Sequence, residues 1–197
     1  MIHPHTELQF ISGEMGYGVV ATQLIPKGTI TWVQDELDIV LTSAQIEKMG
    51  DFYKDILDIY TFRNNKGDHV LCWDHGKYVN HSFKSNCLTT PYDFEIAIRD
   101  IYPGEQLTDD YGYLNISRPF RAVHEGTKRQ VVYPDDLLKY HGKWDRLIAE
   151  AFNHILEVDQ PLREILPEET LKKIKNIHKG KEELESILSC YFPGRGK

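Results

Sequence analysis

Three short groups of residues in the first 112 positions offer atoms suited to ligand binding and chemistry. Gly16-Tyr17-Gly18 precedes a strand-like segment, and its glycines let the backbone approach a ligand because they lack a Cβ atom. Asn80-His81-Ser82 offers amide and imidazole groups that can hold a polar ligand such as an amino acid or adenine. Tyr111, beside a glycine, ends the third group. Taken singly, the three also suit a turn, a hydrogen-bonded loop and a core aromatic residue.

The segments that must position these groups are short and rich in β-forming residues up to about residue 115. The strand-like segments are residues 19–24, 29–33, 37–41, 69–73 and 94–99. In the last of them Phe94 and Ile96 alternate with Glu95 and Ala97, which predicts a strand with one buried face. One helix is predicted from Ala44 to about residue 59, with Ser43 as its cap. Because the strands do not alternate regularly with helices, a doubly wound parallel sheet is excluded.

After about residue 134 the apolar residues follow a helical period. One stripe at i, i+3, i+4 and i+7 spacing consists of Trp144, Leu147, Ile148, Ala151, Phe152 and Ile155. Pro167-Glu168-Glu169 opens a second predicted helix, and Gly180 closes it. A third helix is predicted from about Leu184 to Tyr191, ending before Pro193.

Composition narrows the class of protein. The 197 residues are 41% hydrophobic and 27% charged, which is ordinary for a soluble globular chain, and the net charge of −7 argues against direct nucleic-acid binding. The three cysteines have no disulfide-like spacing, which favours a reducing compartment. No signal peptide and no run of 18 apolar residues is visible, so we expect no membrane contact and a cytoplasmic location. A nuclear location or delivery to a host cell stays open, as does the oligomeric state.

Together, in this order and separation, the three groups resemble the motifs of the SET-domain family of protein-lysine methyltransferases. Residues 14–30 are similar to the opening motif and first hairpin of that family. Asn80-His81-Ser82, continuing to Asn86-Cys87, is similar to its central motif, and residues 97–112 are similar to its closing strand and tyrosine motif. The resemblance covers about residues 6–115.

The resemblance implies an α+β fold with a mainly-β core of the β-clip type. Several small sheets and a threaded C-terminal segment would form this core over residues 1–116, and an α-helical extension over residues 117–197 would pack on it. The closing segment would tuck under a loop and bring Asn80-His81 to Tyr111. Members of the family bind S-adenosylmethionine on one face and admit the lysine of a protein substrate through a narrow channel from the other.

The resemblance also implies roles for individual residues. Tyr111 would be the catalytic tyrosine and Tyr60 a second channel tyrosine, although Tyr60 also suits an aromatic core position on a strand. The residues that would contact the cofactor are Gly16, Tyr17, Gly18, Asn80 and His81. Methyl transfer from a sulfonium to a neutral amine is mainly a positioning task, which a tyrosine hydroxyl can serve. The expected partner is a protein that presents a lysine, in a basic segment.

Two departures from the family pattern bear on activity. Many members have an aromatic residue where this chain has Asp109, and a carboxyl there changes the packing or the polarity of the channel. Many members also carry a cysteine-rich zinc site after the core, whereas residues 118–132 contain no cysteine. We therefore expect no metal there, and we expect the C-terminal helices to cover the active site instead. These departures leave a catalytically weak or inactive protein-binding module as the alternative function.

A metal site of another kind is the remaining alternative for the central motif. Cys72, His75, His81 and Cys87 form the pattern C-x2-H-x5-H-x5-C, whose residue types are zinc ligands. The spacing differs from that of common zinc fingers, and His81 already belongs to the cofactor motif. An unrelated β-rich fold with accidental motif matches is the third possibility.

Overall fold

The computed structural model describes residues 1–194, so the last three residues of the predicted extension lie outside it. Within that range the strands form five small sheets. Three of the sheets have two strands each: β1 (Thr6–Ser12) with β2 (Gly16–Ala21), β7 (Asn80–His81) with β10 (Thr108–Asp109), and β11 (Phe120–Arg121) with β12 (Val131–Val132). The other two have three strands in the orders β3 (Ile30–Val33), β9 (Phe94–Ala97), β8 (Cys87–Thr89) and β4 (Ile39–Leu41), β6 (His69–Leu71), β5 (Thr61–Arg63).

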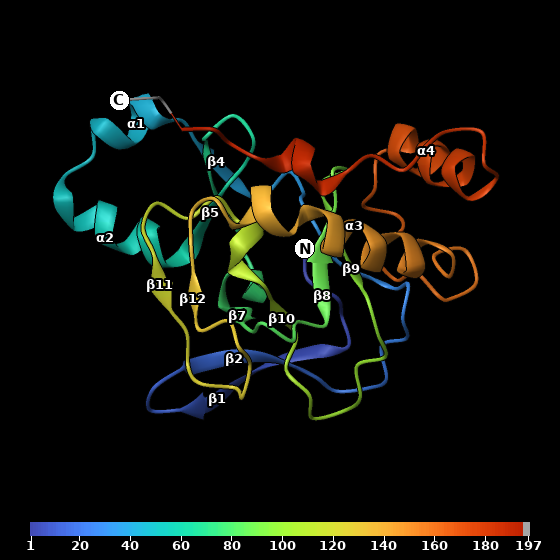
Figure 1. The fold of residues 1–197 in the computed structure, drawn as a ribbon, viewed down its shortest axis with the longest axis horizontal. Helices are drawn as coiled ribbons and strands as arrows, with labels where there is room; N and C mark the ends of the chain where they lie inside the picture. Colours follow the sequence, from blue (N-terminus) through green and yellow to red (C-terminus); the bar gives the residue numbers. More distant parts are fainter. Residues whose placement is uncertain (195–197) are drawn as a thin grey trace.

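The helices lie in two regions of the chain. Helices α1 (Ser43–Glu47) and α2 (Asp51–Tyr60) interrupt the strands, whereas α3 (Asp136–Phe152) and α4 (Glu168–His178) follow them. Three 3-10 turns complete the elements: η1 (His75–Tyr78), η2 (Tyr111–Tyr113) and η3 (Ile187–Cys190). Figure 1 shows the β1–β2 hairpin at one end of the molecule, with α3 and α4 toward the opposite side. The predicted fold class, a mainly-β core followed by a helical C-terminal part, is confirmed.

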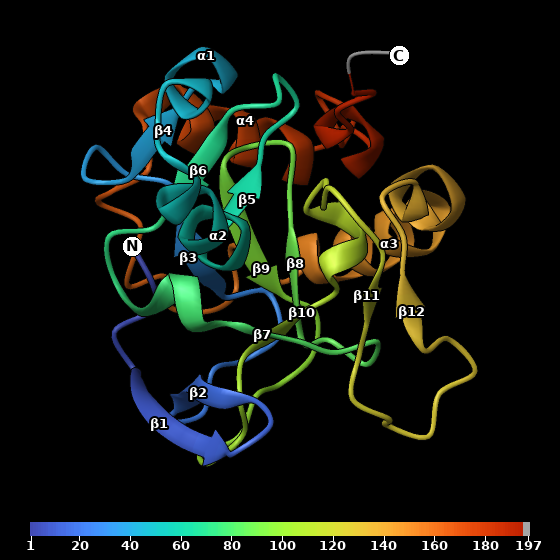
Figure 2. The ribbon, with the colours of Figure 1, turned by 90° about the vertical axis from the view of Figure 1, so that its left-hand side faces the viewer.

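The closing segment of the β-rich part returns to pair in parallel with an earlier loop. Thr108 lies opposite Asn80 and Asp109 opposite His81, although nearly 30 residues separate them along the chain. Parallel neighbours need a crossover connection, and here the crossover contains β8 and β9. Figure 2 shows β7 and β10 at the centre of the molecule, between the β1–β2 hairpin and the other sheets. This pairing is the threaded arrangement that the resemblance implied.

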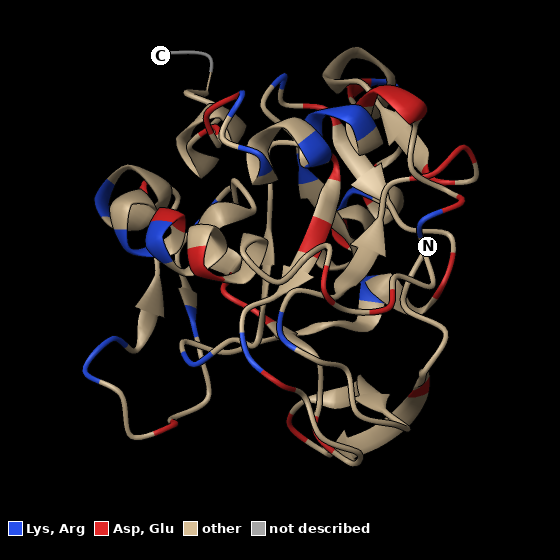
Figure 3. Ribbon diagram, turned by 90° about the vertical axis from the view of Figure 1, so that its right-hand side faces the viewer, with Lys and Arg blue, Asp and Glu red and all other residues tan. Residues whose placement is uncertain are grey.

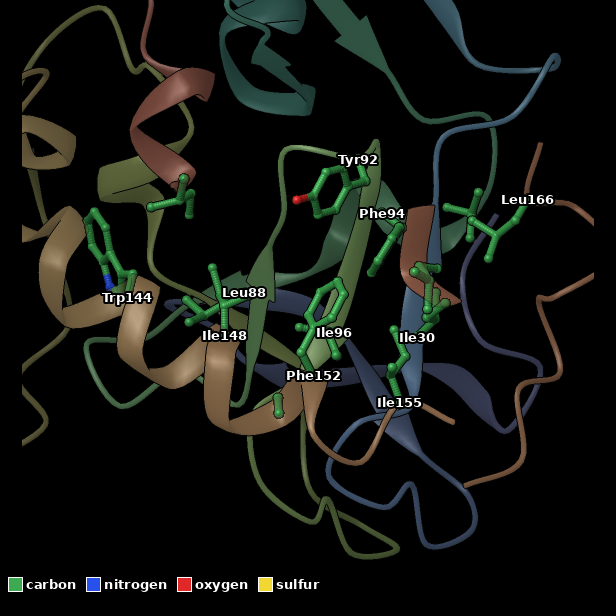
Figure 4. Close-up of a cluster of buried hydrophobic side chains, with 14 of the residues drawn as sticks. Ile30, Leu88, Tyr92, Phe94, Ile96, Trp144, Ile148, Phe152, Ile155 and Leu166 are labelled. Atoms are coloured by element: carbon green, nitrogen blue, oxygen red, sulfur yellow. The ribbon is translucent and has the colours of Figure 1, made fainter. Parts of the chain in front are cut away.

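The sheet β3–β9–β8 is covered on both faces. Leu88, Phe94 and Ile96 point into a core that the C-terminal helices complete (Figure 4). Cys87 and Ala97 point the other way, into a second core with residues of β2 and of the closing segment. The predicted single buried face of residues 94–99 is therefore wrong. The period-2 pattern could not predict burial of the second face, because the segments that cover this face are distant in the sequence.

The helical extension is joined to this sheet by packing and by hydrogen bonds. Trp144, Ile148 and Phe152 of α3 are buried in the first core, as the helical stripe predicted. The Gln160 side chain accepts a hydrogen bond from the Ile30 amide and donates one to a carbonyl of the turn before β3, both 2.8 Å long. The boundary at residue 116 stays a prediction, because the first core contains residues from both sides of it.

Two predicted helices differ from the structure. The helix expected over residues 44–59 is broken into α1 and α2 near Gly50, and Thr42 caps the first piece where Ser43 was expected. Glycine weakens a helix interior, which explains the break. The third C-terminal helix is reduced to the turn η3, whereas α4 begins after Pro167 as predicted. Ser186 caps that turn through its side chain, and its extended backbone prevents an earlier start.

Charged residues of both signs occur on the helices and on the connecting loops in the view of Figure 3. Among residues 1–194, no helix combines the length and the apolar character needed to cross a bilayer.

Replacing Ile148 with alanine tests the packing of α3 on the sheet. Ile148 is 1% exposed, so the substitution should leave a cavity and lower the free energy of unfolding by about 2–5 kcal/mol. Leu138 on the same helix is 47% exposed, and Leu138→Ala should change it by less than about 0.5 kcal/mol. Urea denaturation measures both, and equal losses would contradict this packing.

Candidate active site

Asn86 holds the threaded strand in place. This residue is 1% exposed, and its side-chain oxygen accepts the Thr108 amide at 2.8 Å. Its side-chain nitrogen donates to the Gln106 carbonyl at 2.8 Å, and its own amide donates to the Thr108 carbonyl at 3.2 Å. A buried amide side chain with these partners satisfies backbone groups that so short a strand pair leaves free. The second half of the central motif is thus a clamp on the segment that carries Tyr111.

The pairing brings His81 and Tyr111 into contact, as the resemblance implied. The Tyr111 amide donates to His81 Nδ1 at 3.1 Å, and the two rings lie 5.3 Å apart. Because Nδ1 accepts, the ring proton of the neutral imidazole lies on Nε2, which is buried and has no partner among the residues that the structure describes. Burial lowers the pKa of His81 to about 4, so the ring is neutral at pH 7. Tyr111 donates its hydroxyl proton to the Val79 carbonyl at 2.8 Å.

Asn80 connects the site to the first hairpin. Its side-chain nitrogen donates to the Tyr17 carbonyl and to Gln106 Oε1, both at 3.0 Å. A Cβ atom on Gly18 would lie 2.4 Å from that Gln106 oxygen and 2.7 Å from the Asn80 nitrogen, so this position requires glycine. The close approach at Gly18 is thus to side chains of the protein, and Gly16 has a positive φ of 75° that suits the hairpin turn.

Two cavities meet at Tyr111. The larger has a volume of about 630 Å³ and is lined by Asn80, His81 and other polar residues. The smaller, of about 110 Å³, is also lined by Tyr111. The residues that line both cavities are Asp58, Ile59, Thr61, Tyr111 and Ile116. A larger polar space and a smaller space therefore share the Tyr111 side chain as a wall.

The predicted site residues divide between these cavities. Tyr60, at the end of α2, lines the smaller one. The larger cavity is lined by Glu14 and Met15 from the turn of the first hairpin. Its lining does not include Gly16, Tyr17 or Gly18. Their contact with a cofactor stays a prediction.

The segment just after Tyr111 covers the larger cavity. Its lining residues extend along the chain to Glu125 and include Phe120, whose ring lies 5.8 Å from His81 and 6.0 Å from Tyr111. Glu125 fixes the segment, because its carboxylate accepts the Ser82 hydroxyl at 2.6 Å and the Phe83 amide at 2.8 Å. Helices α3 and α4 contribute none of these lining residues, so the expectation that they cover the active site is wrong. They pack on the sheet, where the apolar stripe of α3 finds its partner.

Arg129 binds the carboxylate beside Tyr111. Its guanidinium forms ion pairs with Asp110 and Asp136, which are 2% and 1% exposed. The same group lies 4.6 Å from the ring centres of Phe83 and Tyr140. The network fixes the turn η2 against the start of α3. No sequence motif indicated this network, because its charged residues are 7 and 19 residues apart and lie on different segments.

Asp58, Glu95 and Asp109 line the smaller cavity, and the last two interact with each other. Burial and the mutual proximity of the carboxyls raise the pKa of Glu95 well above its ordinary value. The pKa of Asp109 is raised mainly by burial, and its carboxyl accepts the Tyr113 hydroxyl at 2.8 Å. The departure noted at Asp109 therefore changes the polarity of this cavity. Glu95 was not predicted as a site residue, because its strand was expected to have one face in solvent.

The cysteines and histidines of the alternative metal pattern are not assembled as ligands. Cys87 is buried in the second core and Cys72 lines the smaller cavity, whereas His81 faces the larger one. Across residues 1–194, no three side chains of the ligand types come together around one point. Burial raises the pKa of both thiols, which keeps them protonated.

Replacing Arg129 with methionine tests the ion-pair network. The substitution leaves two buried carboxylates without a cation, so we expect the free energy of unfolding to fall by about 3–5 kcal/mol. Arg118 also pairs with an aspartate, Asp58, but its side chain is 79% exposed, and Arg118→Met should cost less than about 1 kcal/mol. Chemical denaturation of the two variants separates these cases. A similar small loss in both would show that the network does not hold η2.

Comparison with known proteins identifies the region that carries these residues. Residues 16–112 match the family model of the SET domain. The Drosophila melanogaster histone-lysine N-methyltransferase Set2 is 28% identical over 121 residues, which make up 55% of this chain and 5% of that protein. The chain therefore spans a small part of the length of the curated relative it matches. A Plasmodium falciparum protein described as a histone methyltransferase aligns with 18% identity and a TM-score of 0.41, over 56% of this chain and 95% of that one. The matched range contains the paired strands β7 and β10, the residues Asn80 and His81, and Tyr111. The chain belongs to the SET-domain family.

Proposed function

We propose that this protein transfers a methyl group from S-adenosylmethionine to a lysine side chain of a protein substrate. The observation that carries the proposal is the position of Tyr111 between a larger polar cavity and a smaller one. A donor bound in the first cavity and an amine in the second would meet at this tyrosine. Membership of the SET-domain family supports the same reaction.

The larger cavity suits the cofactor by its size and by its polar groups. A volume of about 630 Å³ falls in the usual range for small-molecule sites. The buried Nε2–H of His81 lacks an acceptor within residues 1–194, and a bound ligand would supply one. Asn80, His81 and Phe120 would hold the cofactor, partly through an aromatic face. When bound, S-adenosylmethionine supplies an activated methyl group on a sulfonium.

The smaller cavity suits the end of a lysine side chain. Aromatic residues line much of its wall, among them Trp32, Tyr60 and Phe62. A volume of about 110 Å³ corresponds to about three or four water molecules at ~30 Å³ each, so it admits a narrow chain. Aromatic walls attract a cationic amine through their π faces and exclude bulk water. Exclusion of water favours the neutral amine that attacks.

Tyr111 would orient the amine through its hydroxyl oxygen. Because the hydroxyl proton is donated to Val79, the lone pairs of the oxygen stay free to accept an N–H bond of the substrate. Burial and the nearby Asp109 raise the pKa of Tyr111, so the group acts as a neutral hydroxyl. Its contribution is positioning, which is the main task in an in-line displacement.

Asn80→Ala tests the cofactor site without any substrate. S-adenosylmethionine or S-adenosylhomocysteine at about 1,000 times Kd should stabilise the wild type by about 4 kcal/mol, measured as a thermal shift. The variant should lose this shift, and its apo melting temperature should fall by a few degrees because two acceptors lose their donor. Asn65→Ala removes an exposed amide outside both cavities and serves as the control. A full shift in Asn80→Ala would place the cofactor elsewhere.

Tyr111→Phe tests catalysis. Removing one hydroxyl keeps the ring, so cofactor binding should persist while methyl transfer falls about 10²–10³-fold. The assay uses mixed basic proteins and a labelled methyl donor, with Tyr60→Phe as a second variant that should alter the rate or the number of methyl groups added. Tyr102 is 56% exposed, and Tyr102→Phe is the matched control. Normal turnover in Tyr111→Phe would refute the catalytic role. Cofactor binding with no methylation by the wild type would favour a protein-binding module.

A further inference from the structure

The chemistry at Tyr111 leaves one requirement unmet, and the inference below rests on the proposed function. A lysine ammonium must lose a proton before its nitrogen can attack, since its pKa in water is about 10.4. Tyr111 cannot take this proton, because its hydroxyl already carries one and donates it to Val79. His81 accepts the Tyr111 amide through Nδ1 and carries its ring proton on Nε2, which leaves no free basic atom.

Glu95 and Asp109 place carboxyl groups where such an acceptor is needed. Both line the smaller cavity together with Tyr111. One comes from β9 and the other from the threaded strand β10, and the two carboxyls lie close enough to shift each other's pKa. Two buried carboxylates this close repel each other, so one of them keeps its proton and the pair carries one negative charge. The Tyr113 hydroxyl donates to Asp109 and stabilises that charge on it.

Among residues 1–194, no lysine or arginine forms an ion pair with either carboxyl. The titratable groups that act on the pair are Cys72, Cys87, Tyr111, Tyr113, Asp110 and the N-terminal ammonium. The thiols and phenols are neutral, because burial raises the pKa of each. Arg129 binds Asp110, and the N-terminal ammonium pairs with Asp35 at 2.9 Å. Asp58, Tyr60 and Lys77 also line the cavity; Asp58 pairs with Arg118 at 2.8 Å, and the Lys77 ammonium donates to the Trp73 carbonyl at 3.2 Å. An occupant of the cavity therefore meets a carboxylate that no ion pair among residues 1–194 neutralises.

Trp32 supplies independent evidence that the cavity takes a polar occupant. It is 4% exposed and lines the same cavity, and among residues 1–194 its indole N–H has no hydrogen-bond partner. A buried donor without a partner costs about 1–3 kcal/mol, so its acceptor is expected from the contents of the cavity. Aromatic walls, one unmet donor and a carboxylate together fit an alkylamine accompanied by water. They do not fit an apolar ligand.

We propose that the Glu95–Asp109 pair binds the substrate ammonium in the smaller cavity and accepts its proton. One N–H bond of the ammonium breaks and its electron pair stays on nitrogen as the lone pair that attacks. One O–H bond forms on Asp109, so the pair changes from one proton to two. The neutral amine stays against Tyr111. After the methylated product leaves, the pair returns the extra proton to water.

An amine probe tests this proposal without turnover. n-Butylammonium at pH 7 is added to the wild type saturated with S-adenosylhomocysteine, and infrared difference spectra record protonated carboxyl groups. We expect a new protonated-carboxyl band that shifts in heavy water. Asp109→Asn should abolish the band. Binding of n-butylammonium to the wild type with no gain of carboxyl signal would overturn the proposal.

Matched controls separate charge recognition from simple filling of the cavity. 1-Pentanol has a similar length without charge, and it should bind at least 10-fold more weakly than n-butylammonium to the wild type. Glu95→Gln should reduce that preference at least 10-fold, and it provides a second variant if Asp109→Asn folds poorly. Asp93→Asn removes a carboxylate two residues away at a position with φ of 58°, where asparagine is tolerated, and should keep the preference. Equal binding of both probes to the wild type would also overturn the proposal.

The pH dependence of methyl transfer distinguishes this inference from the proposed function. With an internal acceptor, the wild-type rate should be level near pH 7 and fall in acid with an inflection above the ordinary carboxyl value of about 4. Asp109→Asn should depend on free amine from solution, rising about 10-fold per pH unit to about pH 10 and lying about 10³-fold lower at pH 7. Methylation with the same profile in both proteins would reject the acceptor and retain the function. The infrared response without methylation would reject the function and retain an amine site.

Discussion

The parallel pairing of β7 with β10 is the constraint on which the site depends. Two residues on each strand are too few to be stable alone, so the pairing needs the side chain of Asn86 to supply the missing partners. Because of this pairing, Tyr111 and His81 form a hydrogen bond although they are 30 residues apart in the chain. The same register sets Asp109 opposite His81; Asp109 lines the smaller cavity and His81 lines the larger one. A slip of one residue would exchange the two faces.

The helical extension supports that pairing from behind. Trp144 of α3 contacts the ring of Tyr113, with centroids 5.4 Å apart, and Tyr113 donates to Asp109. Arg129 binds Asp110 and Asp136, so η2 and the first turn of α3 share one cation. Breaking such a buried network leaves charges without partners, which costs more than a surface pair. The helices therefore act on the site by fixing the residues around Tyr111, although no residue of α3 or α4 lines the larger cavity.

The sequence predicted the parts of this protein whose information is local or motif-like. The turn at Gly16, the helix after Pro167 and the stripe of α3 follow from turn chemistry and periodicity, whereas the first hairpin came from the resemblance. The contact of His81 with Tyr111 came from the resemblance, since composition alone left both residues with ordinary roles. Glu95 and Arg129 could not be assigned, because their partners are 7 to 19 residues away and lie on other elements.

The electrostatics of the smaller cavity explain why an acid at position 109 is compatible with a SET-type site. A carboxylate in an apolar cavity is costly, but a second carboxyl that keeps its proton leaves only one charge to be stabilised. The Tyr113 hydroxyl offsets part of that cost, and a bound ammonium would offset the rest. An aromatic residue at the same position would lower the cost of an empty cavity and would offer no place for the proton. The cavity of this chain is thus less stable when empty and better matched to a cationic amine, which is the state in which lysine arrives at neutral pH.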